Sequence, residues 1–178
     1  MDCELMLVTS QHIVLCQGAK LQAYSFSDQL QREWVMDAPV KFVKAVGGKP
    51  GQEGLLLGLA TGAVQHVFLN NPFPVDLAQH GGPVRCLDWS LNRTRLAVVD
   101  AEGKLATYDP RTRAASFLEN GVSSACFNAD CDGMLCYSTG THLCVRSGGL
   151  APVRVANQGM GEGWGGGRGM SRGGVLCC

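Results

Sequence analysis

The hydrophobic residues of this chain fall in short runs that are separated by polar turns. Runs of about four to seven apolar residues alternate with segments rich in Gly, Asn, Asp or Pro. No segment keeps the period of an amphipathic helix over three turns. The pattern therefore predicts an all-β chain made of short strands.

The clearest structural unit begins at Val84. Four predicted strands follow one another with short polar turns between them, at residues 84–90, 96–100, 105–109 and 114–118. Strands joined in this way form an antiparallel meander, so the segment predicts a single four-stranded sheet.

The same order of strands recurs along the chain, with a spacing of roughly 40 residues. The repeat is visible in the expected starts of first strands near Val40, Val84 and Ser123, and of third strands near Leu21, Ala63, Leu105 and Leu143. A four-stranded sheet with two apolar faces cannot cover both by itself, but radial stacking of successive sheets buries them. The repeat predicts a partial WD40-type β-propeller of about three to four blades, with three and a half as the best count.

The predicted second strands support stacking. They contain the nearly continuous apolar runs HIVLC, LLLGL, LAVVD and MLCYS, as expected for strands that are covered on both faces. The predicted outermost strands, at residues 29–36 and 114–118, are more polar.

The sequence divides into two predicted parts. Residues 1–153 carry the strand pattern and form the predicted partial propeller. Residues 154–178 form a glycine-rich tail, and its last twenty residues contain nine glycines and no repeat. Glycine loses the most backbone entropy on ordering, so we expect this tail to be disordered.

Charge and composition argue against several classes of partner. Fifteen basic and fifteen acidic residues give a formal net charge of zero, which favours neither nucleic acid nor an anionic membrane surface. No apolar run approaches the ~20 residues that cross a bilayer, so no direct membrane insertion is expected. The first residues lack the basic segment of a secretory signal, so the nine cysteines are expected to be thiols in a reducing compartment.

Two segments invite comparison with ligand sites, and neither fits. The loop of residues 47–54 is rich in glycine, but Lys49 precedes a proline and strands flank the loop, which indicates a turn rather than a phosphate cradle. A zinc site would need close ligand spacing, and the candidate cysteines lack a C-x-x-C pair: Cys126, Cys131, Cys136 and Cys144. Neither a cofactor nor a metal is therefore predicted.

No catalytic residue is predicted either, since the chain has no G-x-S-x-G or H-E-x-x-H motif, and we expect it not to be an enzyme. The histidines are expected to pack within or beside strands: His12, His66, His80 and His142. The acids at strand ends are expected to bond turn amides: Asp88, Asp100 and Asp109. Arg168 and Arg172 of the tail are too few for RNA binding of the RGG type.

Several long segments resemble a known family. HIVLCQGAKLQAYSF, VGGKPGQEGLLLGLATG, VRCLDWSLNRTRLAVVD and DGMLCYS are similar to the intraflagellar transport protein 122 family, WD-repeat subunits of intraflagellar transport complex A. The similarity runs from about Cys3 to Val153. It implies a segment of the second propeller, from a family in which two propellers precede a helical solenoid.

The resemblance also implies a function. The expected role is a non-enzymatic scaffold that binds other complex A subunits, in retrograde intraciliary transport, cilium assembly and protein localisation to cilia. The expected locations are the cytoplasm, the cilium and the ciliary basal body. The loops at residues 49–53 and 70–74 are candidate contact regions, with no specific partner-binding residue assigned.

Two alternatives stay open. The chain could be a truncated, non-functional isoform or gene-model fragment, because the tail after Val153 departs from the family pattern and an incomplete ring leaves a blade face uncovered. A propeller that binds a small molecule or acts as an enzyme is the other alternative, although no small-molecule substrate is expected.

Overall fold

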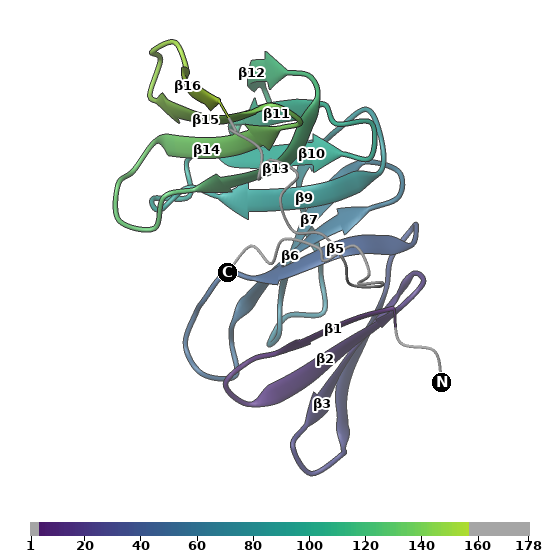
Figure 1. The fold of residues 1–178 in the computed structure, drawn as a ribbon. Helices are drawn as coiled ribbons and strands as arrows, with labels where there is room; N and C mark the ends of the chain where they lie inside the picture. The colour runs from purple at the N-terminus through teal and green to yellow at the C-terminus, as the bar shows by residue number, and fades with distance from the viewer. Residues whose placement is uncertain (1–3, 157–178) are drawn as a thin grey trace, which may run out of the picture.

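A computed structural model of the chain describes residues 4–156, which form sixteen strands in four antiparallel sheets. Each sheet contains four consecutive strands in chain order, and we call the sheets blades 1 to 4. Figure 1 shows them stacked in chain order, with β1–β3 at one end and β13–β16 at the other. The structure confirms the predicted all-β fold.

The first two blades come from the first half of the chain. Blade 1 contains β1 (Leu5–Val8), β2 (His12–Gln17), β3 (Lys20–Ser25) and β4 (Leu30–Val35). Blade 2 contains β5 (Val40–Ala45), β6 (Gly54–Leu59), β7 (Ala63–Phe68) and β8 (Val75–Gln79).

The other two blades repeat the arrangement. Blade 3 contains β9 (Val84–Trp89), β10 (Leu96–Asp100), β11 (Leu105–Tyr108) and β12 (Ala115–Glu119). Blade 4 contains β13 (Val122–Phe127), β14 (Met134–Thr139), β15 (His142–Ser147) and β16 (Val153–Ala156). The predicted starts of the first strands near Val40, Val84 and Ser123 are confirmed to within one residue.

Blade 4 is complete, whereas the best sequence-based count was three and a half blades. Its last strand β16 pairs with β15, so Val153 lies opposite Val145 and Val155 opposite Leu143. The predicted domain boundary after Val153 therefore falls inside a strand. The alternation of valines with Arg154 is a strand pattern. Because a glycine-rich segment follows closely, the predicted tail includes residues 154–156 of this strand. The rest of the predicted disordered tail lies outside the described residues.

Three hydrophobic clusters hold the stack together, one between each pair of neighbouring blades. Strand β6 shows why its sequence is continuously apolar. Leu55 and Leu57 pack toward blade 1, while Leu56 between them packs toward blade 3. Side chains of a strand alternate between its two faces, so a strand covered on both sides must be apolar at every position.

The blades at the ends of the stack behave differently. In β2, Val14 and Cys16 are buried against blade 2, but Ile13 and Leu15 on the other face are only partly buried. Strand β14 shows the same alternation. The prediction that second strands are covered on both faces is therefore confirmed for β6 and β10. It is wrong for β2 and β14, because blades 1 and 4 each have only one neighbouring blade among the described residues.

The first strands of the blades lie next to one another: β1 contacts β5, β5 contacts β9, and β9 contacts β13. The loops that follow these strands are therefore neighbours on one side of the stack. Among residues 4–156 no helix is long and apolar enough to span a bilayer.

Candidate functional site

The loops between the first and second strands of the blades form a connected surface, which we call the first-loop face. It consists of residues 9–11, 46–53, 90–95 and 128–133. A polar contact joins each loop to the next. Ser10 donates from its amide to Glu53 (3.1 Å), Arg93 donates to the Val46 carbonyl (2.7 Å), and Asn92 donates from its side chain to Asp132 (2.7 Å).

The carboxylate of Glu53 fixes the loop of residues 46–53 to blade 1. It accepts hydrogen bonds from both the amide and the hydroxyl of Ser10 and is only 7% exposed. Burial raises the pKa of Glu53, but the hydrogen bonds from Ser10 and from backbone amides outweigh it, so the pKa lies below its ordinary value. Glu53 is the last residue of a predicted contact region. Its carboxylate bonds within the protein and is buried, so it is not presented to a partner.

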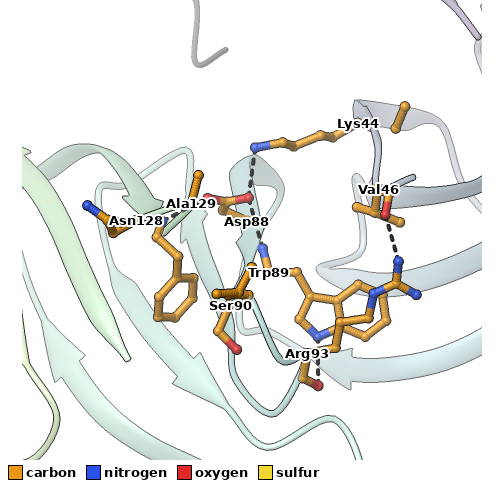
Figure 2. Close-up of a pocket in the computed structure, with 11 residues that line it drawn as sticks. Lys44, Val46, Asp88, Trp89, Ser90, Arg93, Asn128 and Ala129 are labelled. Atoms are coloured by element: carbon orange, nitrogen blue, oxygen red, sulfur yellow. Dashed lines mark hydrogen bonds and ion pairs between the residues drawn. The ribbon is translucent and has the colours of Figure 1, made fainter. Parts of the chain in front are cut away.

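Asp88 joins three blades near the C-terminal end of β9. One of its oxygens accepts from the Lys44 ammonium group (2.7 Å) on blade 2 and from the Trp89 amide (2.9 Å). The other oxygen accepts from the Phe127 amide (2.7 Å) on blade 4. Figure 2 shows Asp88 between Lys44 and Asn128, the residue that follows β13. Because the Asp88 side chain is only 9% exposed, these bonds lie in a medium that strengthens them.

Arg93 reaches from blade 3 to blade 2 beside this junction. Its guanidinium donates to the Val46 carbonyl and lies 5.4 Å from the centre of the Trp89 ring (Figure 2). The Trp89 indole N–H donates to the Arg93 carbonyl (3.1 Å). These contacts hold both the backbone and the side chain of Arg93 in one position.

His66 lies behind Trp89, with the ring centres 5.1 Å apart, and it also contacts the Phe68 ring. Burial, together with the positive charge of Arg93, lowers the pKa of His66 to about 4. The imidazole is thus neutral at physiological pH and acts as a packing group, as the sequence suggested.

An open cavity of about 290 Å³ occupies the junction, and we call it the junction pocket. Its walls come from three blades and include Lys44, Asp88, Trp89, Arg93, Phe127 and Asn128. Leu91, in the loop after β9, also lines the pocket and is 55% exposed. The pocket combines basic groups with apolar surface.

A second polar cluster lies elsewhere and resembles a catalytic triad only in composition. The His80 ring bonds to the Tyr108 hydroxyl (2.8 Å) and to the Asp100 carboxylate (3.1 Å), and all three side chains are buried. Burial, with a smaller effect of the Asp100 charge, raises the pKa of Tyr108. The cluster connects the segment after β8 to strands β10 and β11, which matches the structural role expected for His80.

Two of the three predicted acid roles are confirmed. Asp100 accepts from the amides of Glu102 and Lys104 in the turn after β10, and Asp109 accepts from the Arg111 amide. For Asp88 the prediction is wrong, because its partners lie in strands β5, β9 and β13 rather than in a turn. Lys44 and Asp88 are both the fifth residue of a first strand. Opposite charges at equivalent positions of neighbouring repeats are the sequence feature that could have predicted this ion pair.

The four candidate zinc cysteines are not brought together. Cys126 and Cys136 face each other on β13 and β14, Cys144 is buried on the opposite face of blade 4, and Cys131 lies in an exposed turn. No group of three or more potential ligands that could hold a metal ion occurs within residues 4–156. The glycine-rich loop of residues 47–54 connects β5 to β6, as predicted.

The second predicted contact region, residues 70–74, joins β7 to β8 on the same side of blade 2 as the first-loop face. The amide of Leu69 donates to the Glu53 carbonyl and so links the two predicted regions. Phe73 projects from this loop with 73% of its surface exposed.

Comparison with known proteins identifies the family. The family model described as IFT122 second beta-propeller matches residues 1–168. The chain belongs to the intraflagellar transport protein 122 family. It is 45% identical over 146 residues to the intraflagellar transport protein 122 homolog of Danio rerio and 39% identical over 165 residues to that of Homo sapiens. These alignments cover 82% and 93% of this chain.

The chain spans only 12–13% of the length of these intraflagellar transport protein 122 homologs. The family match also continues to residue 168, beyond the predicted end of the similarity at Val153. Among solved structures, the computationally designed Ika4 protein is similar in fold, with a TM-score of 0.64 and 15% identity, covering 83% of this chain and 92% of that chain.

Proposed function

We propose that this chain is a scaffold unit of the intraflagellar transport complex A type, which binds other complex A subunits and performs no chemistry. The role belongs to retrograde intraciliary transport, cilium assembly and protein localisation to cilia. Its places of action are the cytoplasm, the cilium and the ciliary basal body. Family membership is the observation that carries the proposal.

The structure supports a binding role through the first-loop face. Polar contacts between blades fix each of its loops to the next, so a partner would meet a surface that is already ordered. Exposed apolar side chains on this side of the stack, Leu91 and Phe73, are the kind of anchor that protein interfaces use.

Affinity capture from ciliated cells tests the proposal. The tagged chain is expected to recover other subunits of complex A, identified by mass spectrometry. Replacing Leu91 and Phe73 by glutamate is expected to reduce the recovery at least about tenfold, since charged groups cannot be buried in an apolar contact. Leu118→Glu is the control, because Leu118 is as exposed as Phe73 (73%) but lies on the outer strand β12.

Failure of a folded, monodisperse chain to recover any complex A subunit would contradict the proposal. That outcome would favour the alternative of a fragment without independent activity. Turnover of a small molecule by the purified chain would contradict the non-enzymatic role.

A further inference from the structure

We propose that the junction pocket binds an acidic segment of a partner protein, with a carboxylate between Lys44 and Arg93 and a neighbouring apolar side chain against Leu91. This inference rests on the proposed scaffold function and specifies the partner chemistry of its loop face. It follows from the hydrogen-bonding groups that the pocket leaves available.

The two cations of the pocket, Lys44 and Arg93, have more N–H donors than the described residues accept. An ammonium group has three N–H donors and a guanidinium five. Within residues 4–156, Lys44 uses one donor on Asp88 and Arg93 uses one on the Val46 carbonyl. Both oxygens of Asp88 already accept hydrogen bonds, so the one acid in the wall is satisfied. A ligand must therefore bring acceptors, and a carboxylate is the protein group that best matches a guanidinium.

The apolar part of the pocket favours a peptide over a small ion. Leu91 is 55% exposed, Trp89 is partly exposed, and Phe127, although buried, also lines the pocket. A small inorganic anion would leave this surface in water, whereas an apolar side chain next to the acid would cover it. The ligand predicted is thus a segment in which acidic and apolar residues alternate.

Arg93 is already held in place for such a ligand. Its contacts with Val46 and Trp89 restrict the side chain before binding, so less rotamer entropy is lost when a carboxylate arrives (Figure 2). The nearby loop of residues 128–133 carries two acids, Asp130 and Asp132, and neither lines the pocket. Asn92 holds the Asp132 carboxylate with two hydrogen bonds. Repulsion from the adjacent loop is therefore limited.

Nuclear magnetic resonance provides a site-specific test with the full chain. The probe is a short capped peptide in which a leucine is flanked by glutamates, and the control peptide has glutamine at each acidic position. The Trp89 indole N–H bonds to the Arg93 carbonyl, so its signal should shift on binding. The Trp34 indole donates to the Asn71 carbonyl in another loop and serves as the internal reference. We expect the acidic peptide to shift Trp89 and leave Trp34 unchanged.

Two arginine variants distinguish binding in the pocket from a general effect of charge, and a third variant tests the apolar part of the pocket. Arg93→Gln is expected to weaken peptide binding about tenfold, the usual effect of losing one charge-assisted hydrogen bond. Arg111→Gln removes the same charge from an exposed loop outside the pocket, and it should change the affinity by no more than about twofold. Leu91→Ser should weaken binding of the leucine-containing peptide while an unshifted Trp34 signal reports an intact fold.

Equal binding of the glutamine peptide, or equal losses in Arg93→Gln and Arg111→Gln, would overturn the inference. So would saturation of the Trp89 shift by inorganic phosphate or by anionic lipid vesicles at concentrations where the peptide has no effect. Recovery of complex A subunits by a chain that fails this test would retain the proposed function and reject only the pocket as its peptide site.

Discussion

Asp88, in β9 beside the first-loop face, bonds to both of the blades that neighbour blade 3. It ties Lys44 of blade 2 and the Phe127 amide of blade 4 to blade 3, and it is buried. An uncompensated polar group at such a site costs much more than the net value of a surface ion pair.

Asp88→Asn is therefore expected to lower the free energy of unfolding by about 2–3 kcal/mol. Urea denaturation measures the change as a lower midpoint with an unchanged slope. Asp37→Asn, which removes the same charge from an exposed residue, should change the free energy of unfolding by less than about 0.5 kcal/mol. Similar values for the two variants would show that Asp88 does not couple the blades.

The pKa of His66 predicts a specific loss of stability in mild acid. The pKa is about 4 in the folded protein, against an ordinary value of 6.5. The unfolded chain therefore binds more protons between these values, and stability must fall as the pH decreases through this window. Compared with His66→Gln, the wild-type chain should lose about 1–2 kcal/mol more between pH 7 and pH 5. An imidazole that titrates near 6.5 in the folded protein would contradict the assignment.

Single residues were predictable where the partner is close in sequence. The roles of Asp100 and Asp109 follow from the turns that they begin, and both are confirmed. The role of Asp88 and the burial of Glu53 depend on groups about 40 residues away in other blades. Local sequence patterns do not contain such pairs, although comparison of equivalent positions in the repeat would have suggested Lys44 and Asp88.

At the scale of elements, the turn between β6 and β7 is packed against the connection from blade 2 to blade 3. Gly62 has a φ of +84°, and a side chain there would collide with the His80 carbonyl. His80 also donates from its amide to the Gly62 carbonyl (2.9 Å), so the two backbones cannot easily separate. Only glycine meets both requirements.

Gly62→Ala is expected to lower the free energy of unfolding by about 2–3 kcal/mol through strain and collision. Gly140→Ala is the control, since Gly140 lies in the equivalent kind of turn in blade 4 and a side chain there meets open space. Thermal or urea denaturation compares them. If the alanine variants are equally stable, the close approach at Gly62 is incorrect.

The strands were easier to predict than the ends of the stack. Strands such as β6 and β10 are easy to recognise in the sequence, because a strand that lies between two sheets must be apolar at nearly every position. Strand β16 was missed because its alternating pattern is only four residues long, is exposed throughout and precedes a glycine-rich segment.

At the scale of the molecule, the two outer faces of the stack expose apolar side chains. On blade 1 these include Met6 and Val35, and on blade 4 Leu143 and Val155. Contiguous surface of this kind, with open sheet edges, promotes association between chains. We expect the average mass of the purified chain in light scattering to rise with concentration.

The double variant Met6→Lys and Val155→Lys should suppress this association because it places a charge on each outer face. Leu118→Lys adds the same charge to β12, outside both faces, and should leave the association unchanged. A concentration-independent mass for the wild-type chain would show that these faces do not associate.

Hydrogen exchange of the chain within its captured complex tests most directly whether the stacked blades bind their partners through the first-loop face. Exchange should slow on binding in the loops of residues 46–53, 90–95 and 128–133. It should stay unchanged in turns on the opposite side, at residues 60–62 and 101–104. Protection confined to those opposite turns, or none in any loop of an intact complex, would contradict the account.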